Sequence, residues 1–440
     1  MRLEEKLRQL KSVSKPSNFE TGRETQLESL GSWRGNLKPL PAQRVPLGIE
    51  EYVEGRTYQG SLGEYFAVEQ ALPFGRPYGK MRIGDIAGAD LSPLSIVLGG
   101  PALPDPERLL FLDTETTGLL DGTGTCAFLT GIGAIQGSQF VVRQFFLRDY
   151  AEEKAVLAAL AGELERYEGL VTFNGKAFDA PLLEARYILN NQKSPFNRML
   201  HLDLLHPARQ LWKLRLGSCC LTHLETHVLG IAREGDAPGS EIPGIYFDYL
   251  RTGNARGLQP VFFHNALDIV TLAALTVEMA RVIHQWQLAQ NNALNNGPVT
   301  ETDSIDLFSL SRMFERAGAA DLSLSACARA IEIGLPEAVE PHALWRLAAH
   351  HKRREDFESA EKIWLELTGR ETLIALQAYR ELAIYYERRQ RDLAKALRFT
   401  EQAIALLTLG FSAGAGGDPR VGPFTRRRER LQKRLAALPA

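Results

Sequence analysis

The sequence predicts an α/β domain built on a mixed sheet flanked by helices, followed by an all-α domain of helical repeats. Two observations predict this fold class. Between residues 107 and 287, three strand-like segments precede strands that alternate with helices. Beyond residue 303, amphipathic helices recur at a nearly constant spacing. The hydrophobic fraction of 45% and charged fraction of 24% exclude a wholly disordered or fibrous chain.

Charge, cysteine content and hydropathy limit the compartments and the partners that the protein can have. The 51 basic and 53 acidic residues give a net charge of −2, so local patches or metal ions must hold any polyanionic partner. The four cysteines form no Cys-x-x-Cys pair, which favours a reducing compartment. No segment approaches the ~20 apolar residues of a membrane span, and the charged N-terminus has no secretory signal. We therefore expect a cytoplasmic protein with no membrane partner.

The N-terminal quarter of the chain lacks a clear α/β pattern. Residues 1–50 are rich in charge, Pro and Gly and predict a flexible arm. Residues 51–106 predict a small β-rich cap of uncertain fold, which contains several aromatic residues and ends in a Gly- and Pro-rich linker.

The α/β domain is predicted over residues 107–287. The segment 108–113 predicts a buried strand, and 126–135 and 139–147 predict an antiparallel hairpin with a short turn. The remaining predicted elements are a helix over 152–167, a strand at 169–174, a helix from Pro181, a strand at 201–206 and a long helix over 261–283. This order is the one expected of a ribonuclease-H-like sheet.

A polar linker at 288–303 leads to helical repeats predicted over 304–410. Asp321, Asp356 and Asp392 follow one another at 35 and 36 residues, each between two amphipathic helices. Small residues occupy the equivalent position four residues later: Ser325, Ala360 and Ala396. The pattern resembles tetratricopeptide (TPR) repeats, which implies a surface for a protein partner.

The last segment, 411–440, predicts a basic tail. Residues 420–434 contain seven basic residues and one acidic residue. Such a segment could bind phosphates, or it could form a solvated terminal helix.

Two carboxylates end the first strand of the α/β domain. Asp113 and Glu115 are two residues apart, so they point to the same face of a strand. A buried pair of anions repels itself and needs a cation nearby. The alternative for such a pair alone is two solvated acids at a strand end.

Two further carboxylates lie in helical contexts. Asp179 stands between an apolar strand and the helix that Pro181 opens, where it could also be a helix cap. Asp268 lies in an otherwise apolar helix, one turn after His264, and the two could simply satisfy each other. Four carboxylates from a strand and two helices nevertheless suit a site for two Mg²⁺ or Mn²⁺ ions, with His264 as a candidate general base.

Three segments carry a resemblance to a known family. The motifs DTETTG, FNGKAFD and HNALD occur in the order of the three motifs of the DEDD (ribonuclease-H-like) 3′–5′ exonuclease superfamily. The whole region is similar to bacterial ribonuclease-H-like domains that are often joined to TPR repeats. The resemblance implies that four carboxylates bind the metal ions: Asp113, Glu115, Asp179 and Asp268.

The resemblance also implies roles for neighbouring residues. His264 becomes the general base, although it stands four residues before the last Asp, where the family's Tyr subclass has its Tyr; the His subclass uses five. Thr116, Thr117 and Gly118 match the segment whose backbone approaches the terminal nucleotide. Asn174 and Phe178 match the second motif, and Asn174 could either orient substrate or tie the strand to the helix.

Other candidate groups carry less weight. Cys219, Cys220, His223 and His227 offer zinc-type ligands, but a helix with an apolar face explains the segment better. Asp203 could support the metal site or simply end a solvated strand. No Gly-rich phosphate loop of the GxxxxGK[ST] type is present.

The sequence therefore predicts a metal-dependent nuclease, a 3′–5′ exonuclease acting on single-stranded DNA or RNA. The alternatives are a structure-directed endonuclease and a non-catalytic adaptor whose nuclease domain is vestigial.

Overall fold

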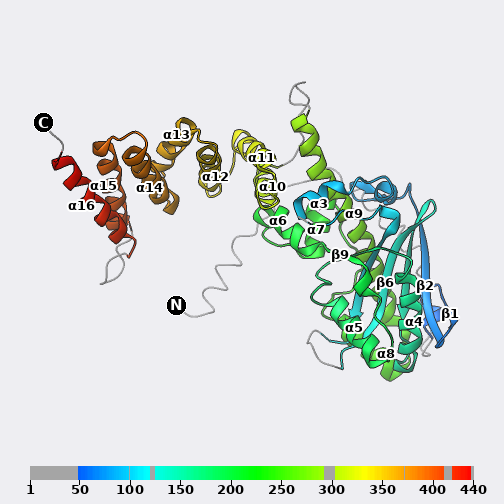
Figure 1. The fold of residues 1–440 in the computed structure, drawn as a ribbon. Helices are drawn as coiled ribbons and strands as arrows, with labels where there is room; N and C mark the ends of the chain where they lie inside the picture. Colours follow the sequence, from blue (N-terminus) through cyan, green and yellow to red (C-terminus); the bar gives the residue numbers. More distant parts are fainter. Residues whose placement is uncertain are drawn as a thin grey trace. The chain divides into compact units, whose positions relative to one another are not determined.

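The computed structural model describes residues 48–98, 100–118, 124–291, 303–370, 372–410 and 419–437 (Figure 1). These residues form two compact units. The first comprises residues through Ala89, Pro104–Leu204 and Cys220–Glu278; the second comprises Asp90–Leu103, Leu205–Cys219 and the chain from Met279. The predicted arm at 1–50 lies almost wholly outside the described residues, as does most of the predicted linker at 288–303.

The first unit is built on a seven-stranded mixed sheet with the strand order β1-β2-β7-β6-β5-β8-β9. β5 pairs antiparallel with β6 and parallel with β8, which pairs parallel with β9. The strands are β1 Gly55–Gly60, β2 Gly63–Pro73, β5 Leu109–Thr116, β6 Ala127–Gln136, β7 Gln139–Phe146, β8 Gly169–Thr172 and β9 Leu200–Asp203. The predicted fold class is confirmed, including the antiparallel hairpin β6–β7.

The structure corrects the prediction of a separate cap over 51–106. β1 and β2 form a hairpin, and β2 pairs with β7 from Phe66 to Pro73, so both strands extend the main sheet. Three consecutive buried residues of β2, Phe66 to Val68, conceal the alternation that normally identifies a strand. The short strands β3 Pro77–Tyr78 and β4 Met81–Arg82 form a separate ribbon.

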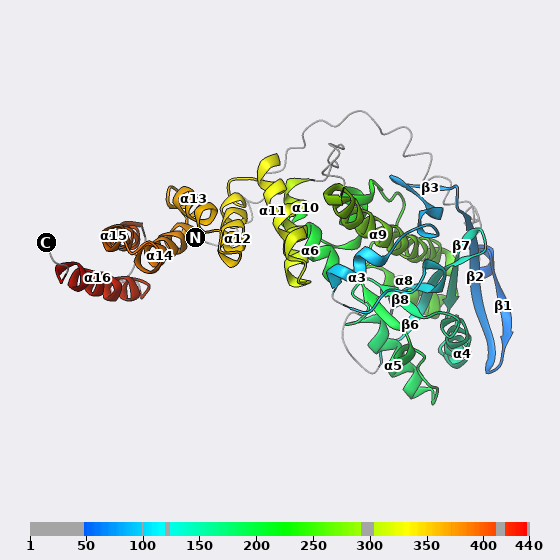
Figure 2. The ribbon, with the colours of Figure 1, turned by 45° about the horizontal axis from the view of Figure 1, so that its top comes forward.

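Helices flank the sheet (Figures 1 and 2), and glycines in β6 allow one of these helices to approach it closely. A side-chain carbon added at Gly131 of β6 would overlap Asn265, and one added at Gly133 would overlap Ile269. These two glycines therefore allow the long helix α9 to approach the strand beside β5. The flanking helices are α4 Glu153–Leu164, α5 Asp179–Leu189, α8 Ile242–Thr252 and α9 Gln259–Asn291.

Aromatic packing fixes α8 on the sheet. Phe128 of β6 stacks on Tyr246 of α8 with ring centroids 4.0 Å apart. The Tyr246 hydroxyl donates to the carbonyl of Leu147 at 3.0 Å, so its only polar group is satisfied in the core. Burying one such ring stabilises the fold by about 2 kcal/mol.

The second unit is helical and begins earlier in the sequence than predicted. α3 Ser92–Leu98 and α6 Leu205–Leu216 pack with α10, so parts of the predicted cap and α/β domain belong to this unit. Arg215 of α6 holds Asp306 of α10 through bonds of 2.7 to 2.9 Å. The later helices are α10 Ser304–Arg316, α11 Ala320–Ile333, α12 Glu340–Arg353, α13 Phe357–Thr368, α14 Leu373–Arg388, α15 Leu393–Gly410 and α16 Val421–Ala436.

Three helix hairpins in this unit share one turn geometry. Gly318, Glu355 and Arg391 have left-handed φ angles of 77°, 61° and 57°. Each stands two residues before the second helix of its pair, and the residue that follows it accepts the first helical hydrogen bond. The hairpins α10–α11, α12–α13 and α14–α15 therefore share a turn conformation that recurs at 37 and 36 residues.

The shared turn also corrects the predicted register of the first hairpin. Asp356 and Asp392 accept backbone N–H groups of Ser359 and Lys395, at 3.2 and 2.9 Å. Asp321 instead lies inside α11, because the equivalent of the two Asp residues is Ala319. The buried small position is therefore Ser323 rather than Ser325, and it is as fully buried as its counterparts Ala360 and Ala396.

The segment predicted as a basic tail contains the helix α16. Phe424 and Leu431 are buried, and the helix packs against α15. Across the part of the chain that the structure describes, no helix is both long enough and apolar enough to span a membrane.

Candidate active site

Asp113 and Glu115 lie on β5 at alternate positions, as their spacing predicts. Asp113 is opposite Gly131 of β6, and Glu115 is opposite Leu129. Asn265 of α9 contacts Asp113, and His264 of the same helix lies beside Glu115. Both carboxylates therefore face α9. They lie on the side of the sheet where the glycines of β6 allow this helix to approach.

A buried amide chain positions Asp113. Asn265 Nδ2 donates to Asp113 Oδ2 at 2.9 Å, and Gln144 Nε2 donates to Asn265 Oδ1 at 3.0 Å. Gln144 also donates to the carbonyl of Phe262 at 2.8 Å, so β7 anchors the chain to α9. Gln144 and Asn265 were not predicted, although each is an amide within an apolar segment and could have been noticed for that reason.

Asp179 begins α5 and points toward β5. The Thr114 hydroxyl donates to Asp179 Oδ1 at 2.5 Å, which brings this carboxylate to the strand that carries Asp113 and Glu115. The Asp179 side chain therefore bonds across to the sheet.

Asp203 organises the loop that delivers Asp179. Its carboxylate accepts the backbone N–H groups of Asn174 at 2.8 Å and Lys176 at 3.1 Å. Asn174 has a left-handed φ of 67°, so its backbone makes the sharp turn between β8 and α5. Asp203 is buried, which overturns the expectation of a solvated strand end.

Asp268 and His264 lie one turn apart on α9 and face Glu115. His264 Nε2 is 3.4 Å from Asp268 Oδ2 and 3.8 Å from Glu115 Oε1. The opposite ring nitrogen, Nδ1, is 2.8 Å from Asp236 Oδ1. Asp236 therefore fixes the imidazole so that Nε2 points at the two carboxylates.

Arg233 is an unpredicted cation at the edge of this group. It donates to Asp268, to Glu225 at 2.5 and 2.6 Å, and to Asp236 at 3.1 Å. Glu225 is almost fully buried, on the π-helical turn Glu225–Leu229. Arg233 and Asp236 lie in an irregular segment with the sequence REGD, which shows no helical or strand periodicity. Their position beside α9 therefore could not be predicted from the local sequence.

The carboxylates destabilise one another electrostatically. Burial, followed by the charges of Asp268, Asp179 and Glu115, raises the pKa of Asp113 well above its usual range. Burial also raises the pKa of Glu115 to about 7, although His264 opposes the rise. The pKa of Asp179 rises to about 6 through burial, partly offset by the Thr114 hydrogen bond.

The neighbouring carboxylates also change the pKa of His264. Burial lowers the pKa of His264, but the hydrogen bond with Asp236 and the charges of Asp268 and Glu115 outweigh it and raise the pKa to about 9. The carboxylates thus attract positive charge strongly, as protons or as a cation.

The donor set fits a divalent cation. Glu115, His264 and Asp268 each offer one ligand atom, and these atoms lie within 4.8 Å of one another. Carboxylate oxygens are the ligands that Mg²⁺ and Mn²⁺ prefer. Arg233 bonds to Asp268 Oδ1, while Asp268 Oδ2 faces His264 and is the oxygen on the cluster side.

The predicted substrate residues surround these groups in different ways. The Thr117 hydroxyl accepts the backbone N–H of Cys126 at 3.0 Å, and the Thr116 hydroxyl donates to the carbonyl of Gly118 at 2.9 Å. These bonds order the segment that follows Glu115. Phe178, directly before Asp179, has 54% of its surface exposed.

The candidate zinc ligands do not assemble into a metal site. Among the described residues, the group Glu115, His264 and Asp268 is the only cluster of three or more His, Cys, Asp or Glu side chains with ligand atoms close enough to share an ion. His223 and His227 stack with ring centroids 4.0 Å apart. None of the four cysteines of the chain, all of them described, forms a disulfide.

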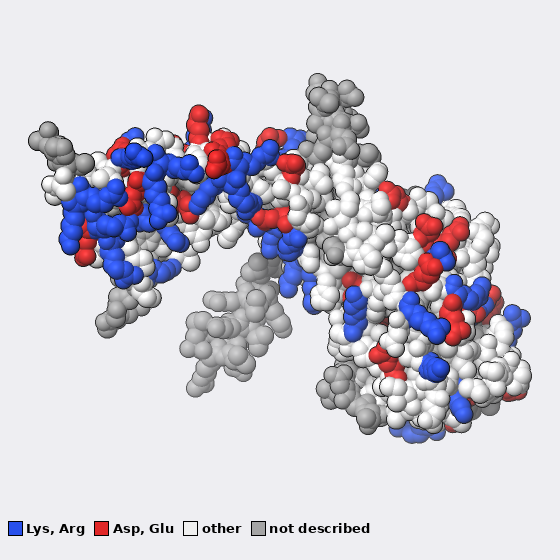
Figure 3. Space-filling model, viewed as in Figure 1, with Lys and Arg blue, Asp and Glu red and all other residues white. Residues whose placement is uncertain are grey.

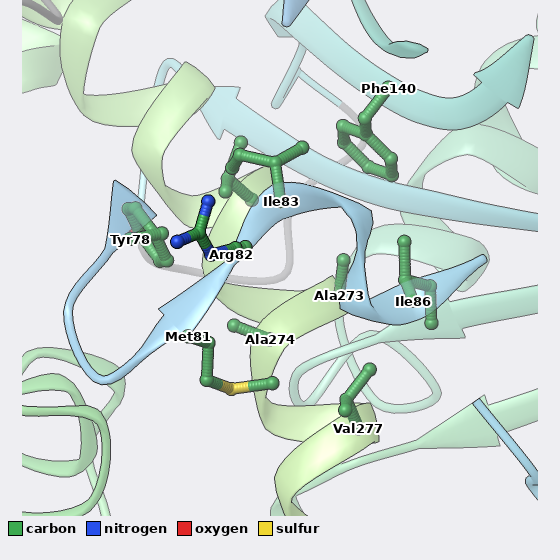
Figure 4. Close-up of a pocket in the computed structure, with 10 residues that line it drawn as sticks. Tyr78, Met81, Arg82, Ile83, Ile86, Phe140, Ala273, Ala274 and Val277 are labelled. Atoms are coloured by element: carbon green, nitrogen blue, oxygen red, sulfur yellow. The ribbon is translucent and has the colours of Figure 1, made fainter. Parts of the chain in front are cut away.

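An apolar pocket lies against α9 (Figure 4). Its lining includes Met81, Ile83, Phe140, Val270 and Val277, with Arg82 as the charged member. It contains no carboxylate or His, so it offers no group for hydrolysis.

Two sequence comparisons relate the chain to known proteins. Residues 110–280 match the RNase_H_2 family of the RNase_H superfamily. The chain is 30% identical over 300 residues to the uncharacterized protein YprB of Bacillus subtilis (strain 168), covering 68% of this chain and 69% of that protein.

A solved structure, the family B DNA polymerase of the archaeon Pyrobaculum calidifontis, is similar with a TM-score of 0.33 and 13% identity. That likeness covers 60% of this chain and 34% of the polymerase, so the chain spans about a third of its length. From the sequence matches, the chain belongs to the family of YprB and carries an RNase H superfamily domain over residues 110–280.

Proposed function

We propose that this chain is a metal-dependent 3′–5′ exonuclease that hydrolyses phosphodiester bonds in single-stranded DNA or RNA. The superfamily of residues 110–280 supports a nuclease-type hydrolase. The observation that carries the finer proposal is the convergence of Asp113, Glu115, Asp179 and Asp268, close enough that the charges of the last three raise the pKa of Asp113. Such a group is the ligand set that two divalent ions require.

In this proposal the four carboxylates hold two Mg²⁺ or Mn²⁺ ions. The bound ions would supply Lewis-acid stabilisation of the charge that develops on the phosphate. His264 Nε2 accepts the proton of the attacking water, and Asp236 holds the ring in place through Nδ1. Cations beside the imidazole disfavour its protonated form, which makes the neutral base available near neutral pH.

The residues around the carboxylates would position the strand end. Thr116, Thr117 and Gly118 form an ordered segment after Glu115, where their backbone can approach a terminal nucleotide. The exposed ring of Phe178 offers a stacking surface, worth about 1–3 kcal/mol per base. Asn174 contributes mainly through its turn, which leads into Asp179.

The helical hairpins would recruit a protein partner. Their repeated turn geometry supports the TPR-like interpretation, and stacked helix pairs commonly present such surfaces. Four cysteines without a disulfide among them support the expectation of a cytoplasmic location.

A cleavage assay tests the proposal. Single-stranded DNA and RNA oligomers labelled at the 5′ end are incubated with the full chain and Mg²⁺, Mn²⁺ or EDTA. We expect a metal-dependent ladder that shortens from the 3′ end. Asp113→Asn should abolish the ladder, whereas Asp248→Asn, the same change at an exposed position on α8, should preserve it.

Substrates with a blocked 3′ end separate the alternatives. Loss of cleavage on blocked substrates supports an exonuclease. An internal cut that persists on blocked substrates would instead support a structure-directed endonuclease. Intact DNA and RNA under all metal conditions would favour the non-catalytic adaptor.

A further inference from the structure

The positive charge of the chain is concentrated at its C-terminal end. Residues 372–440 contain 13 Lys and Arg residues against 6 Asp and Glu residues, while the rest of the chain contains 38 against 47. In Figure 3, blue side chains crowd the surface over the last helices, with few red ones between them. The net charge of −2 therefore conceals a basic region.

One buried glutamate gathers three arginines in this region. Glu387, at the end of α14, accepts bonds from Arg427 at 3.0 Å, Arg430 at 2.8 and 2.9 Å, and Arg434 at 3.0 Å. The three arginines lie on one face of α16 at spacings of three and four residues. Glu387 thus holds three guanidinium groups around a single negative charge.

Two arginines of α14 add to this cluster. Arg380 and Arg388 are exposed and form no ion pair with any carboxylate in the described ranges. The pKa of Arg427 is lowered, first by burial and then by Arg430, Arg388 and Arg380, against the opposing effect of Glu387. We call Arg380, Arg388, Arg427, Arg430 and Arg434 the arginine cluster.

The arginine cluster retains unused donors. Each guanidinium has five N–H donors, whereas one carboxylate has about four acceptor sites. Side chains of Arg430 and Arg434 remain 54% and 51% exposed while bonded to Glu387. Guanidinium groups match the oxygens of phosphate in geometry and charge, so the cluster has the chemistry of a phosphate-binding surface.

The character of the surrounding surface favours nucleic acid over an acidic protein. Protein interfaces bury an apolar centre, whereas nucleic-acid interfaces are polar and positively charged. Within the described parts of α14, α15 and α16, the one large hydrophobic side chain that is exposed is Leu373, at the opposite end of α14 from Glu387. The cluster therefore offers contacts to a phosphate backbone without an apolar centre.

We propose that the arginine cluster binds the phosphate backbone of single-stranded nucleic acid, independently of sequence and apart from the candidate active site. The inference rests on the proposed function, since nucleic acid is the polyanion that this chain would process. Binding at the cluster would keep substrate on the same chain as the nuclease domain and raise its local concentration there.

Fluorescence anisotropy in EDTA tests the inference without cleavage. The full chain is titrated into a labelled single-stranded oligonucleotide of mixed sequence at several salt concentrations. Arg380→Gln/Arg388→Gln should weaken binding about tenfold at low salt and reduce the log–log salt slope by about 1.4, since each lost phosphate contact removes about 0.7. Arg329→Gln/Lys362→Gln, which removes the same charge from α11 and α13, should bind like wild type.

Thermal melting checks the folding of both double variants. If the first double variant melts early, Arg380→Gln and Arg388→Gln are measured singly, each with about half the change in slope. Equal binding by cluster and control variants would overturn the inference. Competition by polyglutamate as effective as that by unlabelled oligonucleotide, at equal charge, would also overturn it in favour of an acidic protein.

The inference and the proposed function fail in different ways. The oligonucleotide could bind in a way that depends on the arginine cluster and yet not be cleaved under any metal condition. This result would disprove the proposed nuclease function, and the arginine cluster would still be a binding site. Cleavage with no effect of the cluster variants on binding would remove the inference alone.

Discussion

At the level of single residues, Asn265 of α9 positions the carboxylate of Asp113 on β5 by donating a hydrogen bond to it. Asn265→Ala removes the amide that donates to Asp113 and leaves Gln144 without one of its acceptors. Loss of a supporting hydrogen bond of this kind costs about 10–100-fold in metal affinity or activity. We therefore expect cleavage to fall by that factor, as measured by initial rates at saturating Mn²⁺.

The matched control for this change is Asn254→Ala. Asn254 accepts the backbone N–H of Arg256 at 3.0 Å in an exposed turn, so its loss costs about 1 kcal/mol of stability and should leave the cleavage rate unchanged. Equal rates for Asn265→Ala and Asn254→Ala would contradict the role assigned to Asn265.

Arg233 is the residue whose loss should damage stability most. Arg233→Ala would leave Glu225 buried without its cation, which costs about 3–5 kcal/mol for a buried pair. Urea unfolding followed by circular dichroism measures this change. Glu225→Gln in the Arg233→Ala background should recover part of the loss, and no recovery would show that the pairing with Glu225 is not the cause.

The sequence predicted the carboxylates of the site but not the residues that hold them. Asp113, Glu115, Asp179 and Asp268 stand out because an acid in an apolar strand or helix is expensive without a function. Gln144, Asn265, Arg233 and Asp236 act through contacts between elements far apart in the chain, and no local spacing encodes such contacts.

At the scale of elements, the turns of the three hairpins carry a measurable cost. Glu355 and Arg391 adopt left-handed φ angles, whereas Gly318 fills the same place without strain. Glu355→Gly and Arg391→Gly should each raise the free energy of unfolding by about 0.5–1 kcal/mol. Gly318→Ala should lower it by a similar amount, and chemical denaturation that shows the opposite signs would contradict the equivalence of the turns.

A buried histidine makes the helical unit sensitive to acid. Burial, followed by nearby arginines, lowers the pKa of His350 to about 4, and its Nε2 lies 3.1 Å from the Ser323 hydroxyl. The unfolded chain binds this proton at about pH 6.5. The stabilising contribution is therefore complete above pH 6.5 and is lost as the pH falls toward 4, at a cost of about 2–3 kcal/mol.

Melting temperatures between pH 7.5 and 4 check this dependence. His350→Asn removes the titrating group and should flatten the acid-induced decrease, whereas His342→Asn, an exposed change on the same helix, should not. An unaltered decrease in His350→Asn would assign the acid sensitivity to other groups.

Strongly patterned elements were predictable, and elements defined by long-range pairing were not. The hairpin β6–β7 follows from two apolar runs joined by a short turn, and the helix α9 follows from one long apolar run. The placement of β1 and β2 in the main sheet depends on pairing with β7, and the assignment of α6 to the helical unit depends on its packing against α10. Neither partner is close in sequence.

At the scale of the whole molecule, the chain combines an acidic cluster and a basic cluster in separate units. The acidic cluster has the charge to attract cations, and the arginine cluster has the charge to attract phosphates. The net charge of −2 indicates neither cluster, because it is the sum over the whole chain. We expect the carboxylates around Asp113 to bind divalent ions for hydrolysis, and a metal-binding measurement tests this without any assumption about the substrate.

The most direct measurement is a calorimetric titration of the full chain with Mn²⁺, paired with thermal melting. We predict two ions per wild-type chain and a melting temperature that rises with Mn²⁺. Asp113→Asn should weaken binding at least tenfold, whereas Asp248→Asn should bind like wild type. A wild-type chain that binds no Mn²⁺, or an Asp113→Asn variant that binds it equally well, would contradict the account.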